Sequence, residues 1–61
     1  MKLMKLQQVI ECTGLARSTI YKLVDEGTFP QQVSLGARSV AWVETEVTDW
    51  ILDKIEKRDK K

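Results

Sequence analysis

The stretch from Thr13 to Val24 holds the side chains best suited to recognising another molecule. At about 100° per residue, a helix over this stretch places Ile20, Leu23 and Val24 in one apolar stripe. The opposite and flanking positions are polar or aromatic, at Arg17, Ser18, Thr19, Tyr21 and Lys22. Guanidinium, ammonium and hydroxyl groups donate hydrogen bonds to phosphates and to base edges. The pattern therefore predicts a recognition helix whose polar face points to solvent.

A glycine turn joins this helix to an earlier one. Apolar or small residues recur at helical spacing before the turn, at Leu6, Val9, Ile10 and Thr13. We therefore expect a first helix over about 6–13, ended by Gly14, and a second over about 16–26. The short link between them predicts a helix-turn-helix. Because Ala16 has no side-chain oxygen, the free amides of the second helix are left to Ser18, Thr19 or a bound phosphate.

A hairpin is expected after the second helix, over about 32–43. Asp25 and Glu26 oppose the helix dipole, so only the first two turns of the second helix are expected to meet DNA. The alternating pattern around the loop predicts two strands joined by a slim tip. The tip consists of Gly36, Ala37, Arg38 and Ser39. Such a tip resembles a wing that enters a groove or follows a phosphate chain, whereas the alternative is an ordinary hairpin with a solvated arginine.

A third helix is expected over about 44–57, opened by acidic residues that suit the positive end of its dipole. Its predicted buried stripe is Val47, Trp50, Ile51 and Ile55. Leu52 lies outside that stripe and could form a small protein-contact spot. The remaining hydrophobic expectations are an extended N-terminal arm at Leu3 and Met4, core positions for Trp42 and Trp50, and a packed, unreactive Cys12.

The composition excludes several classes of function. The chain has 61 residues, a net charge of +1, one cysteine and no histidine. A chain this short makes one domain over 1–61, with little room for a small-molecule pocket, and it has no zinc-ligand set, disulfide framework or histidine base. We therefore expect a cytoplasmic protein that is not an enzyme, with no cofactor, no metal, no small-molecule substrate and no membrane segment. Residues 54–61 carry five basic and two acidic groups, a tail that could reach a phosphate backbone or simply fray.

Six landmarks in order along the chain resemble the AlpA family of prophage regulators. They are Leu6-x-x-Val9, the run from Thr13 to Tyr21, Gly27-x-Phe29-Pro30, Leu35-Gly36-x-Arg38, Ala41-Trp42 and Glu46-Val47-x-x-Trp50. The resemblance implies a MerR-like winged helix-turn-helix, mainly α with a small β-hairpin, related to excisionases and binding DNA near promoters or attachment sites.

The resemblance places the recognition helix on Arg17, Ser18, Thr19, Tyr21 and Lys22, and the wing on Gly36 to Ser39 with Arg38 as its basic contact. The chain departs from the family pattern at Ala16, where a serine cap is usual, at Gln31 and Ser34, where lysine is common, and at Val43, where a basic residue is common. Each departure removes a cap or a phosphate contact, which predicts weaker and less salt-sensitive binding rather than a different fold.

Two functions of different classes remain open from the sequence. The first is a sequence-specific DNA-binding protein of a prophage or mobile element, acting as a transcriptional regulator or recombination directionality factor. Its expected partners are double-stranded DNA and, in addition, a recombinase or further copies of itself on adjacent sites. The alternative is a protein-interaction module that inhibits a regulator or recombinase through the third helix and the basic tail.

Overall fold

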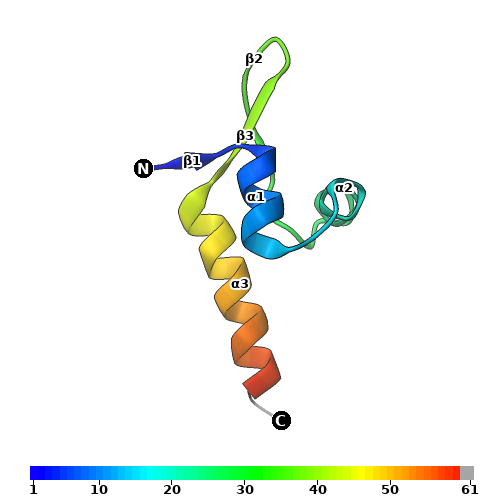
Figure 1. The fold of residues 1–61 in the computed structure, drawn as a ribbon, viewed down its shortest axis with the longest axis vertical. Coiled ribbons are helices and arrows are strands. Elements are labelled where there is room, and N and C mark those ends of the chain that lie inside the picture. Colours follow the sequence, from blue (N-terminus) through cyan, green and yellow to red (C-terminus); the bar gives the residue numbers. More distant parts are fainter. Residues whose placement is uncertain (60–61) are drawn as a thin grey trace.

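Residues 1–59, which the computed structural model describes, form three helices and a small antiparallel sheet. In chain order the elements are β1 (Leu3–Met4), α1 (Leu6–Thr13), α2 (Arg17–Glu26), β2 (Val33–Gly36), β3 (Ser39–Val43) and α3 (Glu44–Asp59). The β2–β3 hairpin and α3 extend in opposite directions along the long axis, with α1 and α2 beside their junction (Figure 1). The expected mainly helical fold with a small hairpin is confirmed, and it is compatible with a winged helix-turn-helix.

The turn between α1 and α2 is built from its own residues. Gly14 has a φ of 73°, and its N–H donates to the Ile10 carbonyl at 2.8 Å. The Thr13 hydroxyl donates to the Val9 carbonyl at 2.8 Å and accepts from the Leu15 N–H at 3.2 Å. A residue with a Cβ would be strained at this positive φ, so the glycine allows the sharp change of direction that starts α2.

The N-terminal arm is confirmed as a strand of the sheet. β3 is the central strand, with β1 on one side and β2 on the other, both antiparallel to it. Leu3 pairs with Val43 and Met4 with Trp42. The Glu44 N–H also donates to the Lys2 carbonyl at 2.9 Å, which ties the start of the chain to the start of α3.

The core draws one or two side chains from almost every element. The fully buried large side chains are Val9, Ile20, Trp42 and Val47, and the other buried core residues are Met4, Val24, Phe29 and Ala41. The Trp42 ring nitrogen donates to the Pro30 carbonyl at 2.9 Å, so the one polar atom of the largest core side chain is satisfied. The expected central position of Trp42 agrees with this structure.

Three hydrophobic expectations need correction. Cys12 is exposed rather than packed, because it lies at the outer edge of the apolar stripe of α1. Ile55 is 39% exposed and Trp50 is only half-buried. The second half of α3 extends past α1 in Figure 1, so the apolar stripe continues beyond the elements that could cover it.

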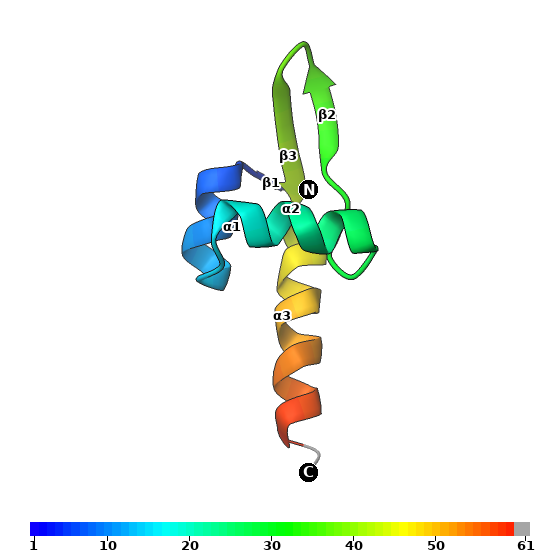
Figure 2. The ribbon, with the colours of Figure 1, turned by 90° about the vertical axis from the view of Figure 1, so that its right-hand side faces the viewer.

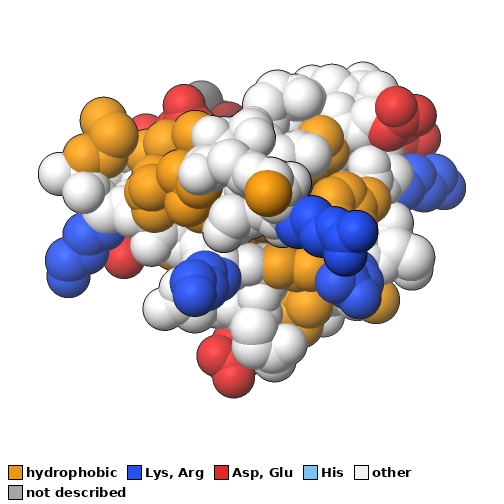
Figure 3. Space-filling view, turned by 90° about the horizontal axis from the view of Figure 1, so that it is seen from above, with side chains coloured by type: hydrophobic (Ala, Val, Ile, Leu, Met, Phe, Trp, Pro, Cys, Tyr) orange, Lys and Arg blue, Asp and Glu red, His pale blue; other side chains and the backbone are white. Residues whose placement is uncertain are grey.

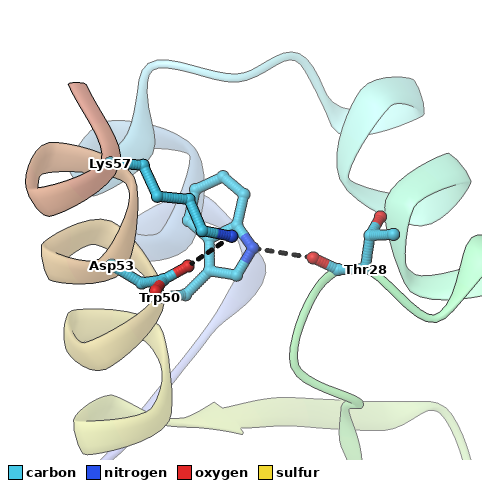
Figure 4. A network of polar contacts seen from close by, with 4 residues as sticks. All are labelled: Thr28, Trp50, Asp53 and Lys57. Carbon is cyan, nitrogen blue, oxygen red and sulfur yellow. Dashed lines mark hydrogen bonds and ion pairs between the residues drawn. The ribbon is translucent and has the colours of Figure 1, made fainter. Parts of the chain in front are cut away.

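The half-buried Trp50 joins α3 to the segment that follows α2. Its ring nitrogen donates to the Thr28 carbonyl at 2.7 Å (Figure 4). Its ring meets Phe29 edge to face with centroids 4.8 Å apart, and the Lys54 ammonium lies 5.2 Å from the ring centre. In the next turn, the Lys57 ammonium and the Asp53 carboxylate are 3.3 Å apart. Trp50 thus links α3 to Thr28 and Phe29 at the edge of the core.

Trp50→Phe tests the contribution of the Trp50–Thr28 hydrogen bond to stability. The smaller ring still meets Phe29 but cannot donate to Thr28, so the free energy of unfolding should fall by about 0.5–1.5 kcal/mol, the net value of one hydrogen bond. Urea unfolding followed by circular dichroism measures the change. Leu52→Ala is the control, because Leu52 is 55% exposed and its loss should change stability by no more than about 0.5 kcal/mol. A Trp50→Phe protein as stable as the wild type would show that the hydrogen bond contributes nothing.

Candidate nucleic-acid interface

The outer face of α2 presents most of the residues that the sequence singled out. Ile20 and Val24 are buried and Leu23 packs partly against the core, so the opposite side of the helix faces solvent. Arg17, Ser18, Tyr21 and Lys22 are exposed on it. Thr19 is partly buried because it lies beside the buried stripe, so it has less surface to offer a ligand than its neighbours. The role of these residues in DNA contact stays a prediction.

The first turn of α2 has a net positive field. Ala16 is the N-cap residue, and no side chain within residues 1–59 caps the helix, so the expected capping by Ser18 or Thr19 is wrong. The first turn has no acidic residue, and Arg17 opens it. Uncapped amides, the helix dipole and an arginine together favour an anion at this end.

The hairpin tip forms the second part of the candidate interface, beside the outer face of α2. Gly36, with a φ of 121°, pairs with Ser39, and Ala37 and Arg38 make the turn between them. The register shifts between Ser34 and Gly36, a bulge that increases the twist of the hairpin. All residues from 33 to 39 are exposed, and the tip stands clear of the helices in Figures 1 and 2. Arg38 forms no ion pair with another described residue.

One aromatic contact connects α2 with the hairpin. The Tyr21 ring lies 6.2 Å from the Trp42 ring, centroid to centroid, at an interplanar angle of 59°. Tyr21 belongs to α2 and Trp42 to β3, and α2 crosses beside β3 where the hairpin begins (Figure 2). Because Trp42 is itself fully buried, this contact helps to hold the outer face of α2 and the hairpin in one orientation.

Charge is distributed unevenly along α2. Arg17 and Lys22 lie in its first two turns, whereas Asp25 and Glu26 lie at its end, where the last turn has no basic residue. Figure 3, which looks along the long axis from the hairpin, shows Lys and Arg side chains on both sides of the molecule, with several close together toward the side that carries α2 in Figure 1 and an acidic group further along that side. A polyanion would therefore be attracted to the beginning of α2 and repelled by its end.

The sequence predicted little room for a pocket inside the domain, but an open pocket lies on the surface beside the end of α2. It has a volume of about 400 Å³ and is lined by Tyr21, Val24, Asp25, Gly27, Gln31 and Gln32. The sequence feature that marks it is the polar pair Gln31–Gln32 directly after Phe29-Pro30, where Gln31 stands in place of the lysine common in the family pattern. Its chemistry differs from that of the rest of the candidate interface, since the single charged residue in its lining is acidic.

Neither a metal cluster nor a membrane-spanning helix is found within the described chain. Among residues 1–59, no group of three or more histidine, cysteine, aspartate or glutamate side chains could hold a metal ion. No helix in the same range is long and apolar enough to cross a membrane. The candidate interface itself consists of the polar face of α2 and the hairpin tipped by Arg38.

Comparison with known proteins identifies the family of this arrangement. Residues 2–55 match the family model described as prophage CP4-57 regulatory protein (AlpA). The chain belongs to the AlpA family. This confirms the resemblance drawn from the six landmarks, which lie within the matched residues.

Two relatives show the extent of the AlpA similarity. An uncharacterised protein of Enterobacteria phage P4, ORF88, is 46% identical over 54 residues, covering 88% of this chain and 61% of the phage protein. The DNA-binding transcriptional activator AlpA of Escherichia coli K12 is 38% identical over 56 residues, covering 82% of this chain and 80% of the activator. The chain thus spans less than two thirds of the phage protein.

Proposed function

We propose that this chain is a DNA-binding transcriptional regulator of a prophage or related mobile element. The observation that carries the proposal is the exposed face of α2, with Arg17, Ser18, Tyr21 and Lys22, held by the Tyr21–Trp42 contact beside a hairpin tipped by Arg38. Membership of the AlpA family supports it, because that family indicates a DNA-binding transcriptional regulator of prophage origin. We propose that residues 1–61 act as one such domain, in the cytoplasm with the DNA.

The proposed docking places the first two turns of α2 in the major groove. The groove of B-DNA is about 12 Å wide and admits a helix, and base edges are read there by side chains near the helix start. Arg17 and Lys22 would supply contacts to phosphates or guanine, while Ser18 and Tyr21 would donate or accept hydrogen bonds. Free amides at the start of α2 would meet a phosphate. The acidic end of α2 would lie away from the backbone.

The hairpin tip would meet adjacent backbone or the minor groove. Arg38 is the one charged residue between 31 and 43, so its guanidinium would provide the contact. A monomer of this size reads few base pairs, and we therefore propose that several copies bind repeated sites. Transcriptional regulation and control of recombination direction could both follow from such assembly, with a recombinase as an additional partner in the second case.

A gel shift on the chain's native upstream DNA tests the proposal. Duplexes tiled across that region are compared with a scrambled duplex of equal length and composition, at several salt concentrations. We expect one or more native duplexes to bind more tightly than the scrambled duplex, and footprinting should then show protected, repeated sites. Equal affinity for all duplexes at every salt concentration would refute sequence-specific binding.

The exposed side chains of α3 favour a second candidate function. Leu52 and Ile55 are 55% and 39% exposed, and residues three apart lie on the same side of a helix. They offer a small apolar surface for a protein-interaction module that would inhibit a regulator or recombinase. The basic tail belongs to the same hypothesis, although Lys60 and Lys61 lie outside the described residues. Absence of DNA binding, together with a partner lost in Leu52→Ser, would favour this alternative.

Arg38→Ala tests the hairpin as a wing. Loss of one phosphate contact should weaken binding to native and scrambled duplexes about equally and reduce the slope of log affinity against log salt by about one. Titrations of each duplex at several salt concentrations measure both quantities. Arg38→Lys is the matched control, because it keeps the charge and should keep the slope. Identical slopes for wild type and Arg38→Ala would remove the hairpin from the interface.

A further inference from the structure

The pocket at the end of α2 has a chemical character of its own. Two side-chain amides, one carboxylate and one aromatic ring line it together with Val24 and Gly27, and its only charged lining residue is Asp25. We propose that this pocket binds an arginine side chain presented by a partner protein. The proposal goes beyond DNA binding, because phosphates would be repelled from this end of α2, and it does not depend on that function.

An unsatisfied buried oxygen provides the first step of the argument. The Gln32 Oε1 atom is shielded from solvent and accepts no hydrogen bond from any described residue. A buried polar atom without a partner costs roughly 1–3 kcal/mol, so such atoms are rare without a reason. Gln32 lines the pocket, so a rotation of its side chain would bring this oxygen to a ligand that donates a hydrogen bond.

The other polar groups of the pocket require the same kind of ligand. The Gln31 Nε2 atom already donates to the Val24 carbonyl at 2.9 Å, which leaves its oxygen as the free end of that amide. The Asp25 carboxylate forms no ion pair within residues 1–59. It also lies at the negative end of the α2 dipole, where a cation is favoured and the last turn supplies none. The pocket thus favours a donor that carries positive charge.

Tyr21 distinguishes arginine from other cations. Tyr21 is 37% exposed, and its ring is held in place against Trp42. A guanidinium is planar, stacks on aromatic rings and presents several N–H donors at once, so it can engage a carboxylate, an amide oxygen and a ring together. A lysine ammonium lacks the planar fork, and a metal ion would find one carboxylate where it needs several ligands.

A protein partner fits the location better than a nucleic acid does. Asp25 and its neighbour Glu26 would face the phosphates on either side of any base that approached this end of α2. Bases in a duplex are stacked and present only their edges, whereas a long side chain can enter a pocket of about 400 Å³. Charge complementarity therefore favours an arginine-bearing protein segment.

Nuclear magnetic resonance titration of the ¹⁵N-labelled full chain tests the site. The probe is the acetylated and amidated tripeptide Gly-Arg-Gly, and the matched neutral probe replaces arginine by citrulline, which has nearly the same shape. We expect saturable shifts at the Gln32 side-chain amide and the Gly27 backbone with the arginine peptide. Citrulline and lysine peptides should bind about tenfold more weakly or not at all.

Two variants separate a binding role from a structural one. Asp25→Asn should lower the affinity for the arginine peptide about tenfold. Glu11→Gln removes an exposed carboxylate from α1 and should leave that affinity unchanged. Gln32→Met replaces the buried oxygen with an apolar group of similar size. This variant should also lower the affinity for the arginine peptide, while its thermal stability should equal or exceed that of the wild type.

Other results would overturn the proposal. Equal shifts with all three peptides, or equal affinity in Asp25→Asn and Glu11→Gln, would mean that the pocket does not recognise a guanidinium. Shifts of the Gln32 amide on adding a DNA duplex, with altered base preference in Asp25→Asn, would assign the pocket to the DNA interface. A dimer in sedimentation that Asp25→Asn dissociates would assign it to self-association. Failure of DNA binding alone leaves the peptide result unaffected.

Discussion

Trp42→Ala is expected to remove most of the free energy of unfolding at 25 °C. Trp42 is fully buried in the central strand, its ring nitrogen donates to Pro30, and its ring supports Tyr21. Truncating a buried tryptophan to alanine typically costs about 3–5 kcal/mol. Native domains are stable by only about 5–15 kcal/mol, and a chain this short lies near the lower end. Far-ultraviolet circular dichroism and urea unfolding measure the loss.

The control for Trp42→Ala is a large apolar residue on the same hairpin. Leu35 is 51% exposed, so Leu35→Ala should change the free energy of unfolding by no more than about 0.5 kcal/mol. A cooperative transition of Trp42→Ala near the wild-type urea midpoint would contradict the central role assigned to Trp42. Trp42→Phe should be intermediate, because it keeps an aromatic ring in the core but loses the hydrogen bond to Pro30.

Arg17→Ala and Lys22→Ala are expected to have the largest effects on DNA binding. Both side chains are exposed on α2 and neither contributes to the core, so the variants should fold like the wild type. Truncating a side chain that contacts a base edge should cost about 1–3 kcal/mol of binding free energy. The protein should then also discriminate less strongly between the four bases at one position of the site. Competition titrations with single-base variants of the bound duplex measure both effects.

Lys57→Ala provides the charge-matched control for these variants. It also removes one positive charge, but from the exposed second half of α3, which points away from the hairpin (Figure 1). We expect it to change specific affinity much less than either α2 variant. If Lys57→Ala proves as damaging and the two α2 variants bind normally, the interface lies on α3 and the proposed docking of α2 is wrong.

Local chemistry explains why the helices and strands could be predicted closely. Gly14 ends α1 in the sequence and in the structure, because the φ needed for the turn suits a residue without a Cβ. The expected start of α3 at Glu44 agrees with the structure, and its end differs by only two residues, at Asp59. The spacing of the apolar residues in α2 indicated its buried side, and the opposite side of the helix must therefore face solvent. Four of its five candidate residues are exposed for that reason.

The depth to which each residue is buried depended on neighbours far away in the chain. A stripe continues along α3 to Ile55, but the elements that could cover it stop earlier, so Ile55 is exposed and Trp50 only half-buried. Periodicity indicates which side of a helix is apolar and carries no information on where the covering element ends. The same reason applies to Cys12, at the margin of its stripe.

The candidate site required tertiary structure where it joins separate segments. Tyr21 and Trp42 are 21 positions apart, and no local pattern predicts that their rings lie 6.2 Å from each other. The pocket likewise exists because the segment after Pro30 folds back along α2, where Gln31 bonds to Val24. Sequence alone therefore determined the elements and the polar face of α2, since these depend on neighbours within a few residues. Only the packing of distant segments decided the orientation of the hairpin against α2 and the pocket beside the end of that helix.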